Sequence, residues 1–313
     1  MLFLVYFNDL ASVSKFAATI LFADDTNAIY EAATYDILID IIQKDLIELS
    51  DWFKANKLAL NESKTKFIIF HTRNNKPPKE FTIILNDVQL ERVDNIKFLG
   101  VFIQENLLWN THINHICNRV SKATSVLARL KHYLPKYALK VIYNSLCLSH
   151  ISYALIVWGA ASVSDMGRLQ KLHKKGIRHV CNAKYNSHTE PLFKKENILQ
   201  LSDLFKLQCV KLVYKRTNNT LHCYHASKLK TNFEITQTNT RKKDDINITK
   251  PKTTLTKINS LNYKIGSSWN QLDSEIRIYL SKTLQTFTRH VKRCFLSQYQ
   301  DECKIKSCYI CNR

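Results

Sequence analysis

Asp24 and Asp25 are the residues of this sequence whose types and spacing are best suited to chemistry. An apolar stretch, residues 17–22, precedes the pair, and residues 26–30 follow it. Two extended segments that meet at an acidic pair predict a β-hairpin with both carboxylates at its partly exposed tip. Mg²⁺ takes one or two carboxylates together with phosphates and water. The pair therefore predicts a magnesium site, with Asp24 as the expected direct ligand; a simple polar turn is the alternative.

The residues around this pair resemble a known family. Phe22-Ala23-Asp24-Asp25 is similar to the F/Y-A-D-D box, motif C, of reverse transcriptases. Residues 2–10, Leu-Phe-Leu-Val-Tyr-Phe-Asn-Asp-Leu, resemble the segment that precedes this box in LINE-like (non-LTR) retrotransposons, especially jockey-like ones. The resemblance implies an RNA-directed DNA polymerase that takes an RNA template and a DNA primer and uses Mg²⁺ bound by Asp24 and Asp25.

Two further motifs follow in the order that the family shows. Residues 60–66, Leu-Asn-Glu-Ser-Lys-Thr-Lys, look like motif D and place Lys64 where a lysine neutralises or protonates the leaving pyrophosphate. A surface lysine in a turn is the equally weighted alternative. The residues that match motif E, the primer grip, are Phe98, Leu99 and Gly100. We expect a hairpin there, because glycine lets a backbone approach phosphates closely.

The elements that would position these residues are those of an α+β protein. Apolar residues at helical spacing predict a helix over 34–58. It is expected to pack beneath an antiparallel sheet with strands near 67–70, 81–85, 88–90 and 95–103. This is the remnant of a right-hand polymerase palm that the resemblance implies for residues 1–105. A helical thumb and basic region (106–216), a loosely ordered linker (217–260) and a helical tail with a cysteine-rich end (261–313) are expected to follow. The thumb helices are expected near 112–133, 137–156, 169–180 and 199–215.

Charge divides the chain in a way that indicates a polyanionic partner. Residues 1–105 hold 11 basic and 15 acidic residues, whereas residues 106–225 hold 18 basic and 4 acidic ones. Nucleic acid is the commonest partner of such a surface, and a thumb grips its duplex through phosphates. An anionic membrane surface and a solvated helix face are the alternatives. The expected contacts lie on one basic helix: Lys171, Lys174, Lys175 and Arg178.

The resemblance begins at motif C, so the motif A carboxylate and the fingers of a complete enzyme have no counterpart in residues 1–313. We therefore expect a fragment that is inactive alone. The alternative function is a non-catalytic nucleic-acid-binding protein derived from such an element. Oligomeric state is open.

The cysteines and the apolar segments exclude other classes. Cys303, Cys308 and Cys311 could form a zinc site only with a second pair, His290 and Cys294, and free thiols are the expected state. The start of the chain lacks the positive charge of a signal peptide, and residues 151–161 are too short to span a bilayer. We expect a protein of the nucleus or cytoplasm that is neither secreted nor a membrane protein.

Overall fold

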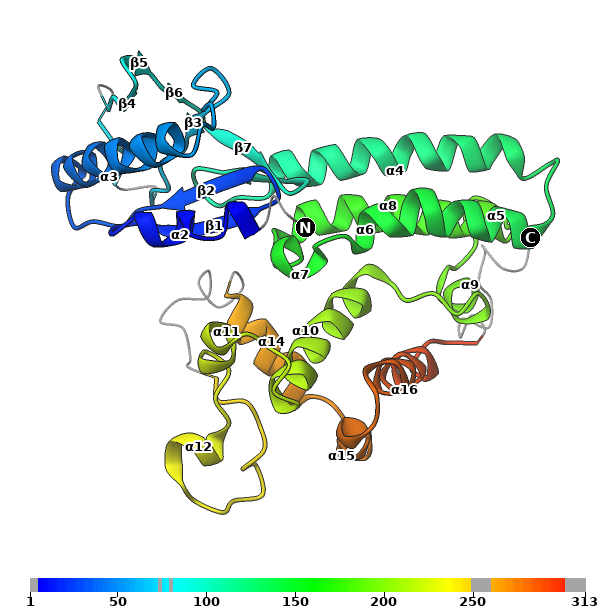
Figure 1. The fold of residues 1–313 in the computed structure, drawn as a ribbon. Helices are drawn as coiled ribbons and strands as arrows, with labels where there is room; N and C mark the ends of the chain where they lie inside the picture. The colour runs from blue at the N-terminus through cyan, green and yellow to red at the C-terminus, as the bar shows by residue number, and fades with distance from the viewer. Residues whose placement is uncertain (1–4, 73–74, 79–80, 249–259, 302–313) are drawn as a thin grey trace. The chain divides into compact units, whose positions relative to one another are not determined.

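The computed structural model describes residues 5–72, 75–78, 81–248 and 260–301, which fall into two compact units, Met1–Leu108 and Trp109–Arg313. Both units contain helices, and the named strands β1 to β8 lie in the first unit (Figure 1). The described chain is thus of the α+β class, as predicted.

The first unit is organised around one long helix, α3 (Tyr35–Ala55). The side chain of Thr34 caps its start by accepting a hydrogen bond from the backbone N–H of Ile37 at 3.4 Å. Ile42, Leu49 and Phe53 are buried along one face. The strands and the other helix of this unit are α2 (Leu10–Val13), β1 (Ala18–Phe22), β2 (Asp25–Ile29), β3 (Lys66–Phe67), β4 (Ile84–Leu85), β5 (Val88–Gln89), β6 (Glu91–Arg92), β7 (Asn95–Phe98) and β8 (Val101–Gln104).

The strands form four separate two-stranded sheets instead of the single palm sheet that the sequence predicted. β1–β2, β4–β5 and β7–β8 are antiparallel hairpins, whereas β3 and β6 pair in parallel. Four of these eight strands, β3 to β6, are two residues long, and the strand expected over 67–70 is reduced to Lys66–Phe67. In this stretch Ile69 is buried, and Phe67 partly buried, against α3 and residues 81–90, whereas Phe70 is exposed. Residues 67–90 are therefore held mainly by packing against α3 and less by pairing of their strands.

The second unit is mainly helical. Its first part comprises α4 (Asn110–Leu130), α5 (Lys136–Tyr143), the π-helical turn η1 (Asn144–Leu148), α6 (Ser149–Ser152), α7 (Leu155–Trp158) and α8 (Val163–Val180). Its second part comprises α9 (Glu190–Lys195), α10 (Leu201–Thr217), α11 (Cys223–Ser227), α12 (Asn232–Thr236), α14 (Leu261–Asn270), α15 (Ser274–Arg277), η2 (Ile278–Ser281) and α16 (Leu284–Ser297). One continuous hydrophobic core runs through both parts.

The helix predicted over 137–156 is interrupted within the described structure. A π-helical turn follows α5, and the extended backbone of Tyr153 ends α6. Ala154 then adopts a left-handed backbone with φ 49° just before α7. The break turns the chain so that Trp158 is fully buried and its indole N–H donates to the carbonyl of Tyr153 at 3.0 Å. Burial of a large aromatic ring offsets the cost of the left-handed residue.

The segment expected to be loosely ordered, 217–260, contains α11 and α12 in its described part. Two of its apolar residues, Leu229 and Ile246, are buried in the core of the second unit. A capping box between Thr231 and Glu234 starts α12.

Candidate active site and nucleic-acid surface

The acidic pair lies at the tip of the β1–β2 hairpin, as the sequence predicted. The register pairs Phe22 with Asp25, which leaves Ala23 and Asp24 as the two residues of the turn. Ala23 has a φ of 52°, the left-handed region that favours glycine, so the turn holds some backbone strain. Asp24 and Asp25 are both exposed, and neither forms an ion pair with a described residue. Two adjacent carboxylates are therefore presented to solvent on a short, defined turn.

A buried carboxylate, Asp45 of α3, holds the base of this hairpin. It is fully buried, and it accepts hydrogen bonds from Ser14 Oγ at 2.6 Å, the Lys15 backbone N–H at 3.2 Å and Tyr30 Oη at 2.8 Å. Its donors lie just before β1 and just after β2, so both ends of the hairpin are fastened to one helix. Burial, and next the bond to Asp45, raises the pKa of Tyr30.

The charged residues between the apolar positions of residues 34–58 predict a polar helix face that includes Asp45. That prediction is wrong for Asp45, which is fully buried. A signal was present, because Asp45 stands three residues after Ile42 and four before Leu49, both buried. An acid at the spacing of the apolar stripe faces the core, and there it needs hydrogen-bond donors.

Lys64 lies in an exposed turn that Asn61 organises. Asn61 Oδ1 accepts from the Lys64 backbone N–H at 3.2 Å and from Ser63 Oγ at 2.7 Å, and Thr65 Oγ1 donates to the Asn61 carbonyl at 3.0 Å. These contacts explain the Asn-x-x-Lys-Thr pattern as a local turn before β3. They fix the backbone of Lys64 and leave its side chain exposed.

The residues that resemble the primer grip form a second hairpin, β7–β8. Phe98 pairs with Val101, and Leu99 and Gly100 make the turn with φ values of 44° and 83°. Positive φ at both positions is the usual geometry of a two-residue hairpin, and it explains the glycine. Phe98 and Leu99 are half-buried, and Gly100 is exposed. The hairpin predicted here is confirmed.

On the basic helix α8 the four predicted contact residues divide into two pairs. Lys171 and Lys175 are exposed and stand one helical turn apart. Lys174 and Arg178 are half-buried, and Arg178 Nε donates to the carbonyl of Ser187 at 2.9 Å. The exposed pair is free to meet phosphates, whereas Arg178 also fastens the loop after α8.

His173, which stands between the lysines of this helix in the sequence, is a core residue. It is fully buried between Tyr143 and Phe193, and its ring centroid lies 4.8 Å from that of Phe193. Neither ring nitrogen has a hydrogen-bond partner among the described residues. Burial lowers the pKa of His173 to about 3, so the residue is neutral and adds nothing to the basic surface.

Cys303, Cys308 and Cys311 lie outside the described residues, as do residues 2–4 of the segment before motif C. His290 stacks on Tyr279, with ring centroids 3.7 Å apart, and Cys294 Sγ contacts Asp273 Oδ2 at 3.7 Å. Across the part of the chain that the structure describes, no three His, Cys, Asp or Glu side chains gather at a metal-binding spacing. Nor does any described helix combine the length and hydropathy needed to cross a membrane.

Comparison with known proteins finds several similar RNA-directed DNA polymerases. The chain is 24% identical over 201 residues to the RNA-directed DNA polymerase from mobile element jockey of Drosophila melanogaster, a match that covers 63% of this chain and 21% of that protein. It is 23% identical over 192 residues to the probable RNA-directed DNA polymerase from transposon X-element of the same organism, with 59% and 21% covered. With the probable RNA-directed DNA polymerase from transposon BS the identity is 26% over 168 residues, with 52% and 18% covered.

The chain is thus similar to the RNA-directed DNA polymerases of jockey-like, non-LTR retrotransposons. The resemblance predicted from the motifs is thereby confirmed at the level of the family. The matches span only about a fifth of these retrotransposon proteins. No protein-family model matches the chain. No solved structure matches it either.

Proposed function

We propose that residues 1–108 are part of the palm of an RNA-directed DNA polymerase and that Asp24 and Asp25 hold its Mg²⁺. The observation that supports this proposal is the exposed acidic pair on a two-residue turn whose base is fastened to α3 through Asp45. Preorganised ligands of this kind bind a metal without first ordering a loop. Two carboxylates that have no hydrogen-bond or ion-pair partner among the described residues also fit the small number of protein ligands that Mg²⁺ takes.

The hairpin residues would have distinct roles at this site. Asp24, in the turn itself, would be the direct ligand, and Asp25, the first residue of β2, would complete the pair. Bound Mg²⁺ would supply charge neutralisation and an in-line arrangement of the primer hydroxyl and the triphosphate. Lys64 would neutralise charge on the leaving pyrophosphate, and the Leu99–Gly100 turn would contact the primer backbone.

The second unit would bind the RNA template and DNA primer. Residues 106–225 carry 18 basic and 4 acidic residues, and Lys171 and Lys175 present two of these charges on one exposed helix face. Phosphate contacts of this kind are independent of sequence. A non-catalytic nucleic-acid-binding protein is the second candidate function, since the basic surface alone would support it.

We further propose that residues 1–313 alone do not extend a primer. Two-metal catalysis needs carboxylates from more than one segment of the palm, because otherwise the reacting groups are not held in line. In the described residues the acidic pair of the hairpin is joined by no third ligating side chain.

Metal binding can be tested on the chain itself. Mn²⁺ added to the isotope-labelled protein should broaden the amide resonances of residues 22–28 first, because a bound paramagnetic ion relaxes nearby nuclei. The D24N/D25N variant should lose this selective broadening. D87N is the matched control, because Asp87 is an exposed aspartate in the turn of another hairpin, β4–β5. Equal broadening in all three proteins would contradict the proposed site.

Nucleic-acid binding can be tested by its salt dependence. Log affinity should fall with log salt by about 0.7–0.9 for every phosphate contact. The K171Q/K175Q variant should therefore reduce the slope by roughly 1.4–1.8 if both residues meet phosphates. The R241Q/K242Q variant removes the same charge from exposed residues elsewhere in the unit and should leave the slope unchanged. An unchanged slope for K171Q/K175Q would place the contacts elsewhere.

A further inference from the structure

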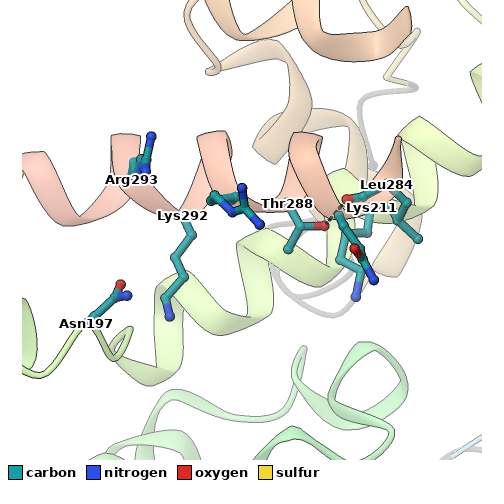
Figure 2. Close-up of a pocket in the computed structure, with 8 residues that line it drawn as sticks. Asn197, Lys211, Leu284, Thr288, Lys292 and Arg293 are labelled. Carbon is teal, nitrogen blue, oxygen red and sulfur yellow. Dashed lines mark hydrogen bonds between the residues drawn. The ribbon is translucent and has the colours of Figure 1, made fainter. Parts of the chain in front are cut away.

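A basic pocket lies between α10 and α16 of the second unit, and none of the residues that the motifs single out lines it. It has a volume of about 520 Å³ and opens to solvent; side chains of both helices line it (Figure 2). The helices are held together beside it by the rings of Tyr214 and Phe287, whose centroids are 4.8 Å apart, and by a 2.5 Å hydrogen bond from Tyr214 Oη to the carbonyl of Lys282. The pocket is therefore a fixed feature of the second unit.

Positive charge dominates the lining. Arg289, Lys292 and Arg293 come from α16, and Lys211 comes from α10. Residues three and four apart share one helix face, so Arg289 stands directly beside Lys292 and Arg293. Neither residues 204–217 of α10 nor residues 284–297 of α16 include an aspartate or glutamate. None of the four cations forms an ion pair with another described residue.

Two of these cations are half-buried, which makes the lack of a counter-charge costly. Figure 2 shows Lys292 extending from α16 toward α10. Burial, and then the charge of Lys140, lowers the pKa of Lys292, and burial with the charge of Lys215 lowers that of Lys211. A charge that is partly removed from water and unpaired is destabilising, and a bound anion would offset that cost.

We propose that the α10–α16 pocket binds the phosphates of a nucleic-acid strand, as a contact separate from the basic face of α8. This inference rests on the proposed nucleic-acid function and adds a second site to it. Four cations exceed the charge of one inorganic phosphate, which carries about −2 at most near neutral pH by analogy with phosphorylated residues. A strand offers one negative charge at each successive nucleotide, so it matches an open row of cations better than a single small anion does.

A membrane surface fits this pocket less well. Surface-binding helices bury large apolar side chains in the lipid, whereas α10 and α16 expose none of theirs. The large apolar residues of α16, such as Phe287 and Val291, are buried in the core. Anionic vesicles are therefore a control, expected to compete poorly with an oligonucleotide.

The first test measures the affinity of the full chain for a labelled single-stranded oligonucleotide across a salt series. The R289Q/K292Q variant should reduce the salt slope by about 1.4–1.8, the share of two phosphate contacts. The control R241Q/K242Q, which removes the same two charges from exposed positions, should behave like the wild type. Circular dichroism checks that each variant is folded.

The second test uses the unmodified chain and locates the contact directly. Acetylation of lysines, quantified by mass spectrometry, should slow at Lys211 and Lys292 when the oligonucleotide is present and should be unaffected at Lys242. Anionic vesicles at the same phosphate concentration should protect neither pocket lysine. Protection by vesicles but not by the oligonucleotide would overturn the inference in favour of a membrane surface.

The outcomes separate this inference from the proposed function. If the wild type binds the oligonucleotide but R289Q/K292Q keeps its slope and Lys292 stays reactive, the pocket assignment is wrong and the α8 surface stands. If R289Q/K292Q weakens binding while K171Q/K175Q does not, the pocket stands and the α8 assignment falls. A wild-type chain that binds no nucleic acid contradicts both.

Discussion

Replacing His173 with phenylalanine should remove a defined part of the pH dependence of stability. The imidazole is fully buried, neither nitrogen has a partner among the described residues, and burial lowers its pKa from 6.5 to about 3. When folding lowers the pKa of a histidine, the unfolded chain binds the proton more tightly. Stability from this group is therefore fully present above pH 6.5 and is lost as the pH falls toward 3.

The magnitude follows from the two pKa values. At pH 5 the unfolded histidine is mostly protonated and the folded one is not, which costs about 2 kcal/mol relative to pH 7.5. The H173F variant should lack this loss. At pH 7.5 it should also be more stable than the wild type by about 1–3 kcal/mol, because two unpaired buried nitrogens are removed and the ring keeps its place beside Phe193.

Urea unfolding at pH 7.5 and pH 5 measures both effects. Trp52 is the sole tryptophan of residues 1–108, so a W52F background leaves fluorescence from the second unit alone. H132F is the matched control, because His132 is exposed. The pKa values of His112 and His179 are also lowered, and their contributions cancel in the difference between H173F and the wild type. The same pH dependence in H173F and the wild type would refute the reasoning.

Two glycines and one buried carboxylate give further predictions. A Cβ at Gly159 would lie 2.3 Å from Phe205 Cδ2, so G159A should destabilise the second unit by about 1–3 kcal/mol in the same urea assay. A Cβ at Gly167 would have no atom within 4 Å, so G167A should stabilise α8 by about 0.5–1 kcal/mol. D45N should weaken the hairpin attachment by about 1–3 kcal/mol and speed hydrogen exchange of β1 and β2 amides, because the amide presents a donor where the carboxylate accepts three bonds. Unchanged exchange in D45N would show that Asp45 does not hold the hairpin.

Local patterns were sufficient to predict the parts of the site that short-range geometry determines. The hairpin at Asp24 and Asp25 and the turn at Leu99–Gly100 follow from two extended segments meeting at turn residues. The helix over 34–58 follows from its apolar spacing and its threonine cap, and the structure places it at 35–55. Each of these signals lies within about one element of the chain.

Other features depend on which segments meet in space. His173 stands among lysines and so resembles part of a basic face. Only the packing of α8 on α5 and α9 shows that its ring is enclosed. The separate two-stranded sheets were missed because strand pairing is set by long-range neighbours, whereas apolar runs such as 67–70 pack equally well on a helix.

The α10–α16 pocket is of the same kind. Lys211 stands far from residues 289–293 in the sequence, and no periodicity links them. They are brought together by the contact of Tyr214 with Phe287, which no local sequence pattern predicts.

The most direct test of the central claim is primer extension by a completed enzyme. The chain would be fused to the fingers and motif A segment of a related retrotransposon and assayed with an RNA template, a DNA primer and Mg²⁺. We predict extension by the fusion and none by residues 1–313 alone. D24N should reduce the rate by more than the roughly 10²–10³-fold that loss of a single charge-stabilising donor costs, and D87N should leave it unchanged. Extension that survives D24N and D25N together would contradict the assignment of the hairpin as the metal site.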